Sequence, residues 1–359
     1  MKIGILTYHR SHNYGALLQA VALRKVLCNM GHDVTYIDYW PAYHRHMYNL
    51  VNWSLLKKLR LRNKLGYLKN CIKYYRSKKK RISHFQNFIN MYINPYVSSL
   101  DESYDVIIHG SDQIWRKQPE IDTYNRVYFG YHNIQTKCKV SYAASMGVIP
   151  DKKEELELLQ NYLPLLSVIS VREEGLLQLV KKLGNKNTRL DVDPTLLLTG
   201  KEWADFMNIK TSRTEKYILY YSLLRESFLE DEIRKYADER RLKLLTIYGC
   251  ASGKDSYDKV YTADPMKFLK LVYNAEEVFT SSYHGLVFSI LFHKPFFAAF
   301  HNNSSRASSL LERLGLSERL LEPMVSIPYF VHEINFCKVD QKLQTLRKES
   351  MSYLSSLMV

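Results

Sequence analysis

Residues 277–292 read EVFTSSYHGLVFSILF, a short apolar segment followed by a polar turn and an apolar run long enough for a buried helix. The pattern predicts a strand that leads through the turn into a helix. The start of such a helix directs unpaired N–H groups and the positive end of its dipole toward a ligand above the strand. Ser281, Ser282 and Gly285 are small enough for an anion to come close, and His284 would bind the anion or give it a proton. Alternatively, His284 only caps the helix or hydrogen-bonds within the core.

Strand and helix patterns alternate along the rest of the chain. A strand over residues 2–8, a helix over 16–30 and a strand over 33–38 require a parallel sheet with a right-handed crossover. The alternation pauses near residue 193 and then resumes. We therefore predict an α/β fold of two Rossmann-like, doubly wound domains that face each other across a cleft. Their predicted ranges are residues 1–192 and 193–359, the second ending in a helix over 340–357.

Polar residues follow several of the predicted strands. Ligands of open α/β sheets bind beyond the carboxyl ends of the strands, so these residues are expected to line the cleft. They comprise Asn13, Tyr14 and Gly15 after the first strand, Asp112, Gln113 and Trp115 after the strand that ends at His109, and then Ser145 and Arg172. Each alone is compatible with ordinary caps and turns. Their recurrence at one edge of the sheets favours a binding cleft.

The positive charge is concentrated in one segment. Residues 41–100 contain 13 Lys and Arg and no Asp or Glu, which leaves +2 of the net charge of +15 for the rest of the chain. Leucines and Trp53 interleave with these bases at helical spacing, so we predict a basic helical insertion in the N-terminal domain. One interpretation is a contact with an anionic membrane surface through Lys57, Lys58, Arg60, Arg62 and Lys64. The other is a helical hairpin packed on the body with a solvated basic face. No recognition motif favours nucleic acid.

The remaining features exclude several classes of protein. No apolar run reaches membrane-spanning length, and the first residues do not form a signal peptide. The five cysteines are scattered, which favours a reducing cytoplasm over a disulfide framework or a zinc site. The candidate loops lack the carboxylate clusters that hold magnesium, so we expect no metal and no cofactor.

Several motifs together resemble those of one known family. They are NYGALL over residues 13–18, GSDQIW over 110–115, YAASMG over 142–147, SVREE over 170–174, DPTLL over 193–197, SSYHG over 281–285 and KPF over 294–296. In this order they resemble the polysaccharide pyruvyl transferases, nearly from end to end. The basic insertion matches nothing characteristic of that family.

The resemblance implies two Rossmann-like domains in a GT-B-like arrangement. It also implies phosphoenolpyruvate as donor and transfer of pyruvate, as a ketal, onto two hydroxyls of a sugar or lipid-linked oligosaccharide for a bacterial capsule or exopolysaccharide. His284 and Arg172 match the positions important for donor binding and catalysis. The donor side would also include Ser281, Ser282 and Gly285, and the acceptor side the cleft residues of the N-terminal domain.

The chemistry of these residues is consistent with that activity. A helix N-terminus and a bidentate Arg suit the phosphate and carboxylate of the donor. We hypothesise that His284 binds the phosphate and acts as its acid, while Arg172 holds one anionic group. Asp112 and Glu173 are candidates for the base that deprotonates the acceptor. Two alternatives stay open: a GT-B glycosyltransferase that uses nucleotide sugars, and a non-catalytic binding protein in glycan assembly.

Overall fold

The N-terminal sheet is parallel and has the strand order β3-β2-β1-β4-β5. The computed structural model describes residues 1–211, 215–223, 227–250, 253–300, 305–321, 327 and 333–357. The sheet strands are β1 (Lys2–Leu6), β2 (Asp33–Ile37), β3 (Val97–Ser98), β4 (Tyr104–His109) and β5 (Thr136–Ser141). β6 (Ile169–Val171) and β7 (Thr188–Leu190) extend it through isolated bridges, and the helices are α1 (Tyr14–Asn29), α6 (Lys153–Tyr162) and α7 (Glu174–Lys182).

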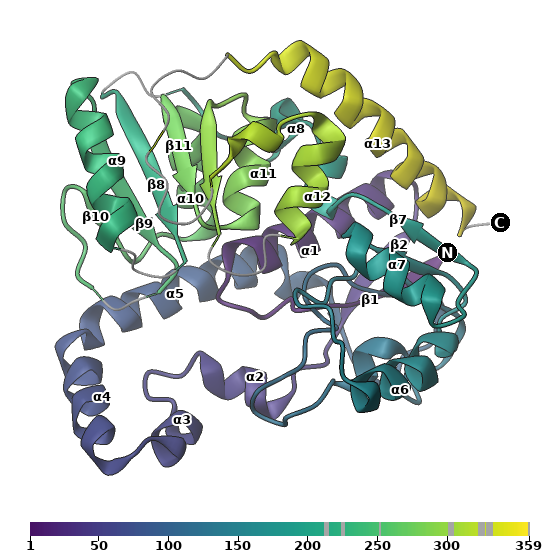
Figure 1. The fold of residues 1–359 in the computed structure, drawn as a ribbon. Coiled ribbons are helices and arrows are strands. Elements are labelled where there is room, and N and C mark those ends of the chain that lie inside the picture. The colour runs from purple at the N-terminus through teal and green to yellow at the C-terminus, as the bar shows by residue number, and fades with distance from the viewer. Residues whose placement is uncertain are drawn as a thin grey trace.

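The C-terminal sheet is also parallel, with the order β10-β9-β8-β11-β12-β13. Its strands are β8 (Tyr217–Ser222), β9 (Lys243–Tyr248), β10 (Lys259–Val260), β11 (Glu277–Thr280), β12 (Phe296–Ala299) and β13 (Leu320–Leu321). Its helices are α8 (Gly200–Phe206), α9 (Ser227–Glu239), α10 (Pro265–Asn274), α11 (Tyr283–Leu291) and α12 (Ser305–Leu314). Both strand orders start centrally and reverse direction, as in Rossmann-like folds. The predicted pair of facing α/β domains is confirmed (Figure 1).

The two domains share one hydrophobic core. α1 lies between the sheets and contacts both α10 and α11. One cluster of buried residues accordingly runs from Ile3 and Ile5 in β1, through Leu17 in α1, to Leu219 and Val278 in the C-terminal sheet. α1 is buried over most of its surface, and its apolar composition accounts for that position.

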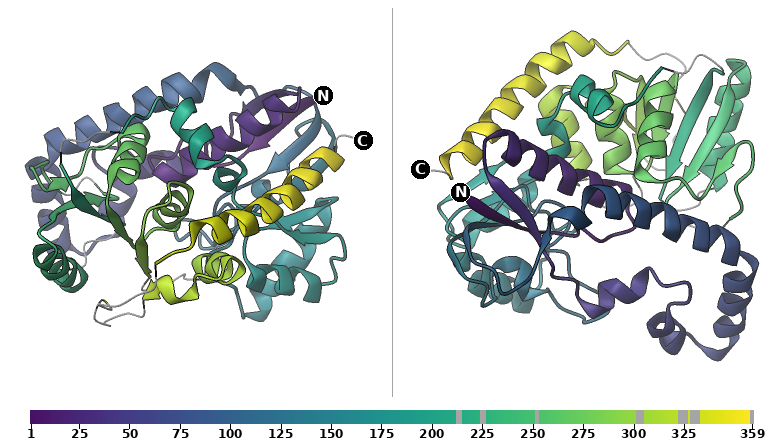
Figure 2. Two further views of the ribbon diagram at one scale, coloured as in Figure 1. Left: turned by 90° about the horizontal axis from the view of Figure 1, so that it is seen from above. Right: turned by 180° about the vertical axis from the view of Figure 1, so that it is seen from behind.

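The basic insertion consists of α2 (Ala42–Met47), α3 (Trp53–Lys58), α4 (Leu61–Lys73) and α5 (Tyr75–Tyr92). α2, α3 and α4 form an arm at the margin of the molecule, whereas α5 crosses back along both domains (Figures 1 and 2). Phe85 and Phe88 of α5 enter the shared core. The predicted end of the insertion at residue 100 is too late, because residues 97–98 form β3 and pair with β2.

The final helix, α13 (Phe336–Ser356), returns to the N-terminal domain (Figure 2). The Tyr353 hydroxyl donates to the Ser141 carbonyl at 2.9 Å, and Ser350 Oγ accepts from the Val192 N–H at 3.1 Å. This helix is four residues longer at its start than the predicted range of 340–357. Although it follows the C-terminal sheet in sequence, it completes the N-terminal domain. Within the described residues, no helix combines the length and apolarity needed to cross a membrane.

Candidate functional site

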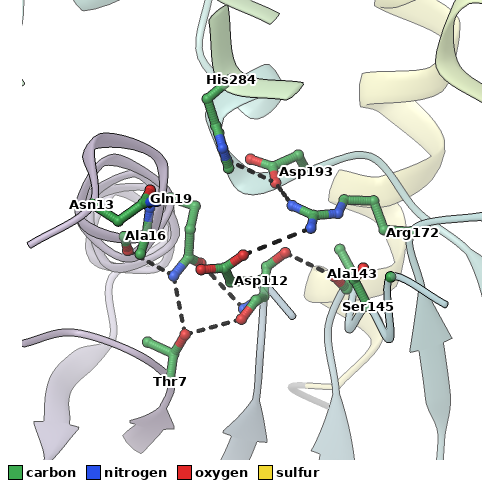
Figure 3. A network of polar contacts seen from close by, with 12 residues as sticks. Thr7, Asn13, Ala16, Gln19, Asp112, Ala143, Ser145, Arg172, Asp193 and His284 are labelled. Carbon is green, nitrogen blue, oxygen red and sulfur yellow. Dashed lines mark hydrogen bonds and ion pairs between the residues drawn. The ribbon is translucent and has the colours of Figure 1, made fainter. Parts of the chain in front are cut away.

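Three side chains from the two domains meet at the junction of the sheets (Figure 3). Arg172 follows β6, Asp193 follows β7 and His284 lies in the first turn of α11; all three are buried. Oδ2 of Asp193 accepts a hydrogen bond from Arg172 Nη1 and lies 3.5 Å from His284 Nε2. Asp112 approaches from the other side, with Oδ1 3.8 Å from Arg172 Nη2. Arg172 and His284, which the sequence predicted to be catalytic, therefore lie together in the structure.

Three helices begin near this junction: α1, α7 and α11. The Asn13 side chain caps α1 by accepting a hydrogen bond from the Ala16 N–H at 3.2 Å. Glu173 and Ser282 hold the N-cap positions of α7 and α11. The first turn of a helix carries partial positive charge and free N–H groups. Together with Arg172, these helix starts favour an anionic ligand.

Two glycines allow close packing at this point. A Cβ on Gly15, in the first turn of α1, would lie 1.8 Å from Nδ1 of His284. A Cβ on Gly285 would lie 2.2 Å from Oγ1 of Thr280. Any larger residue at either position must displace its neighbour. Gly15 of the N-terminal domain thus packs directly on the imidazole of His284 from the C-terminal domain. This role differs from the acceptor contact predicted for Gly15.

The buried charges favour an ionised Asp193. Burial alone would raise the pKa of this carboxyl, but His284 and Arg172 outweigh burial and hold the pKa below its usual range. Burial likewise disfavours the charged form of Arg172, and the carboxylate of Asp193 more than compensates, so the pKa of Arg172 is raised. Thr195 supports the same carboxylate, since its N–H and hydroxyl donate to Oδ1 at 3.0 and 2.6 Å.

Several polar atoms at the site have unused bonding capacity. Among the described residues, Nε and Nη2 of Arg172 have no hydrogen-bond partner, although both atoms are buried. The same holds for Nε2 of His284, Oε2 of Glu173 and Nε of Arg306. Buried polar atoms in native proteins are nearly always bonded. This cluster therefore has hydrogen-bonding capacity for a ligand.

Arg306, in the first turn of α12, was not predicted as a site residue. Its guanidinium lies 5.4 Å from the centre of the Tyr283 ring, and that of Arg172 lies 4.7 Å from the same ring. Burial and the charge of Arg172 lower the pKa of Arg306. Two guanidinium groups thus flank one aromatic ring beside His284. Nothing in the sequence around Arg306 marks it, because tertiary packing alone brings α12 here.

The loop that carries Asp112 is fixed by α1 (Figure 3). Gln19 of α1 donates through Nε2 to Thr7 Oγ1 at 3.0 Å, and that hydroxyl donates to the Ser111 carbonyl at 3.0 Å. The Ser111 N–H donates back to Oε1 of Gln19 at 3.2 Å. Asp112 itself has a φ of 75°, which side chains other than glycine seldom adopt. The backbone that carries Asp112 is therefore held in place by buried hydrogen bonds at some conformational cost.

Ser145 reaches the site through Glu173. The Ser145 hydroxyl donates to Oε1 of Glu173 at 2.9 Å, and the N–H of Met146 donates to the same oxygen at 3.0 Å. One oxygen of the carboxylate is thus fixed, while the other has no partner among the described residues. Ser145 supports Glu173 rather than facing the ligand directly.

Four other predicted residues have structural partners or lie apart. Trp115 is buried in the core of the N-terminal domain and donates its indole N–H to a carbonyl at 2.9 Å. Tyr14 is buried and donates to a carbonyl of the C-terminal domain at 3.0 Å, while Ser281 Oγ accepts from a backbone N–H of the loop after β8 at 3.1 Å. Gln113 is partly buried, and its Nε2 has no partner in the described part of the chain. Trp115 therefore has no face free to contact an acceptor.

A cavity of about 410 Å³ lies between the insertion and the loops that follow β1 and β9. Its lining includes the rings of His12, Tyr48 and Tyr67 and the side chain of Arg81. Burial raises the pKa of Tyr48 to about 12. Arg81 connects the cavity lining with the start of α1, because its Nη1 donates to the Tyr14 hydroxyl at 3.0 Å. Larger hollows of about 640 and 700 Å³ lie between α8 and α13 and near the amino ends of β8 and β9, away from these side chains.

Metal ligands were not expected at this site. Within the described ranges, no three His, Cys, Asp or Glu side chains are grouped as they would be around a metal ion. Turnover without metal stays a prediction.

Comparisons with known proteins concern the sequence and the fold. A sequence model of the polysaccharide pyruvyl transferase family matches residues 13–303. No curated protein matches significantly. The fold is similar to the UDP-GlcNAc 2-epimerase from Neisseria meningitidis, with 9% sequence identity, a TM-score of 0.49 and coverage of 100% of this chain and 99% of that chain. The UDP-GlcNAc 2-epimerase from Methanocaldococcus jannaschii has 10% identity, a TM-score of 0.47 and the same coverage. The fold is also similar to the glycosyltransferase SnogD from Streptomyces nogalater, with 12% identity, a TM-score of 0.43 and coverage of 98% of this chain and 95% of that chain. At these scores the neighbours carry no inference about function.

Proposed function

Because the chain belongs to the polysaccharide pyruvyl transferase family, we propose that it moves pyruvate from phosphoenolpyruvate onto two hydroxyls of a sugar as a ketal. The product would be a pyruvylated capsule, exopolysaccharide or other cell-surface glycan. The observation that carries this proposal is the buried guanidinium of Arg172, in which Nε and Nη2 have no hydrogen-bond partner among the described residues.

The donor matches the charges at the site. Phosphoenolpyruvate has one carboxylate and one phosphate on the same carbon, C2, and two guanidinium groups near the starts of α7, α11 and α12 supply suitable partners. We assign one anionic group to Arg172 and the other to Arg306. Asp193 contacts both Arg172 and His284, so that these two side chains are positioned before the donor arrives.

Ketal formation defines what the side chains must do. A proton is added to C3 of the enol, the first sugar oxygen bonds to C2, and the bond between C2 and the phosphate oxygen breaks. The second sugar oxygen then bonds to C2 and closes the ring. One hydroxyl proton balances the proton gained by carbon, and the other leaves with inorganic phosphate. His284 would bind the phosphate and protonate it as it departs.

The acceptor would enter from the cavity lined by the insertion. Aromatic rings such as Tyr48 and Tyr67 offer apolar faces to a sugar, while polar groups around them direct its hydroxyls. We assign Asp112 as the base, because its carboxylate lies 3.8 Å from Arg172 Nη2 and its side chain remains partly exposed. Glu173 holds the loop of Ser145 and Met146 through one oxygen, which suits a positioning role.

The direct test measures inorganic phosphate released from phosphoenolpyruvate with a panel of galactosides, mannosides and N-acetylhexosaminides, both simple and lipid-linked. Acceptor-dependent release, with the acceptor gaining a pyruvyl ketal by mass spectrometry, is expected. Arg306→Gln should raise KM for phosphoenolpyruvate about tenfold or more, while Arg313→Gln, two turns along α12, should not. A rise in melting temperature with nucleotide sugars alone would instead indicate a glycosyltransferase. The absence of turnover with any donor would indicate a binding protein.

A further inference from the structure

The structure separates the basic insertion into two parts with different surroundings. α5 is packed against both domains, and its Arg81 is buried with hydrogen bonds to the Tyr14 hydroxyl at 3.0 Å and the Tyr261 carbonyl at 3.0 Å. α3 and α4 lie at the margin, away from both sheets (Figure 1). α5 is therefore packed on the body of the protein, whereas α3 and α4 are not.

Three apolar side chains of α4 point to solvent rather than to the protein. Leu61 is 82%, Leu65 66% and Ile72 77% exposed, and their spacing of four and seven residues places them on one face of the helix. The buried face of α4 is the one that carries Cys71. α3 adds Trp53, which is 63% exposed. An amphipathic helix normally packs its apolar face on the core, so this stripe requires another partner.

Basic residues surround this stripe. Seven Lys and Arg lie in and between α3 and α4: Lys57, Lys58, Arg60, Arg62, Lys64, Lys69 and Lys73. No Asp or Glu occurs from residue 41 to residue 100, so nothing within the segment neutralises them. A second copy of the chain would bring the same positive charges together, which disfavours self-association through this face. Nucleic acid would use the charges but leave the apolar stripe exposed.

We propose that α3 and α4, named here the basic arm, dock on an anionic lipid bilayer. The exposed apolar stripe and Trp53 enter the interface, and the bases contact the anionic headgroups. α4 and α5 also carry Tyr67 and Arg81, which line the cavity assigned to the acceptor. If the proposed function holds, a lipid-linked acceptor in the same membrane would meet that cavity directly. The docking itself does not depend on the enzymatic activity.

The test is flotation of the full chain with vesicles of phosphatidylcholine, with and without about 30 mol% phosphatidylglycerol. Binding is expected only to the anionic vesicles and should weaken steeply as salt rises, because screening shortens the range of the attraction. Each engaged base contributes about a factor of five in affinity, so replacing Lys57, Lys58, Arg60, Arg62 and Lys64 with Gln should weaken binding about a hundredfold or more even if three are engaged.

Two further variants separate this docking from a simple effect of net charge. The matched control replaces five exposed lysines elsewhere with Gln: Lys152, Lys153, Lys181, Lys182 and Lys186. It should bind as the parent does, since it loses the same charge outside the basic arm. Leu61→Ser, Leu65→Ser and Ile72→Ser, combined, should weaken binding while retaining every base. Equal losses for the arm and control variants, or an apolar variant that binds like the parent, would overturn the proposal.

A spectroscopic readout covers the possibility that a variant folds poorly. Trp115 and Trp203 are buried, whereas Trp53 is mostly exposed. In the parent, anionic vesicles should shift Trp53 emission to the blue, and Trp53→Phe should remove that shift. Vesicle binding without any change in Trp53 emission would contradict insertion of this face. Concentration-dependent dimerisation that the apolar variant abolishes, without vesicle binding, would assign the face to self-association instead.

Discussion

The contact between Gly15 and His284 offers a sharp test of how the two domains meet. A Cβ at residue 15 would stand 1.8 Å from Nδ1 of His284, whereas ordinary contact begins at 3.4 Å, so the ring or α1 must retreat by about 1.6 Å. Overpacking of this kind costs about 1–3 kcal/mol. In a helix, Ala is otherwise favoured over Gly by about 0.5–1 kcal/mol.

A double-mutant cycle isolates this contact. Gly15→Ala should lower the free energy of unfolding in the parent but raise it slightly in a His284→Ala background, where the ring is gone. The expected coupling is about 2 kcal/mol, measured by urea denaturation of the four proteins. Gly66→Ala is the control, because a Cβ at residue 66 in α4 meets nothing within 4 Å. It should have the same small effect in both backgrounds.

Activity gives a second readout of the same displacement. Misplacing a reacting group by about 1 Å can cost about a hundredfold in rate, so Gly15→Ala should lose most of its turnover while still folding. Additive stability effects across the cycle, or a Gly15→Ala variant with parental turnover, would mean that the imidazole does not rest against α1.

Three other outcomes are expected. Arg172→Lys should weaken phosphoenolpyruvate binding about tenfold or more in titrations, since an ammonium cannot reproduce the guanidinium fork; unchanged affinity would remove this residue from the donor site. Arg81→Gln should lower the free energy of unfolding by about 2–4 kcal/mol because two carbonyls of the C-terminal domain lose a buried donor, whereas exposed Lys79→Gln should be neutral. Burial, with a smaller contribution from the neighbouring His132, lowers the pKa of His109 to about 3, against about 6.5 in the unfolded chain. The folded state therefore binds fewer protons than the unfolded state. Between pH 7 and pH 5 this residue should lower the free energy of unfolding by about 2 kcal/mol. His109→Gln should show a smaller loss over that range in urea titrations, and an equal loss would refute the assignment.

Long periodic segments made the fold predictable. The central strands were found from sequence because nearly all of their residues are buried, five of six in β4 and all six in β8, and this leaves a clear pattern. The edge strands β3, β10 and β13 have only two residues each, so no periodicity can develop. Their pairing is a result of the sheet that precedes them rather than of their own sequence.

The site was predictable only where local sequence determines geometry. His284 and Arg172 follow strands and begin helices, so their placement comes from a local pattern. Arg306 depends on how α12 packs, which no neighbouring residue reveals. Trp115 shows the opposite failure: it stands in a polar loop motif, yet the size and apolarity of its ring take it into the core.

The sequence of the insertion indicates a buried arginine, although the count of 13 bases does not distinguish it from the others. Arg81 shares a helix face with Phe85 and Phe88, both of which are buried. The spacing of four and seven residues predicts one inward-facing surface. An arginine on that surface is expected to be buried and hydrogen-bonded, as Arg81 is through Nη1 and Nη2.

The return of α13 to the N-terminal domain has a consequence for synthesis on the ribosome. The strand pair β5 and β6 emerges early, yet Tyr353 and Ser350, which bond to Ser141 and Val192, are translated only after the entire second sheet. The N-terminal domain therefore stays incomplete, with part of its apolar surface exposed to solvent, until α13 has been synthesised. Such a chain is a natural client for chaperones that hold unfinished polypeptides. A fragment limited to residues 1–192 should accordingly aggregate, and added α13 peptide should reduce that aggregation.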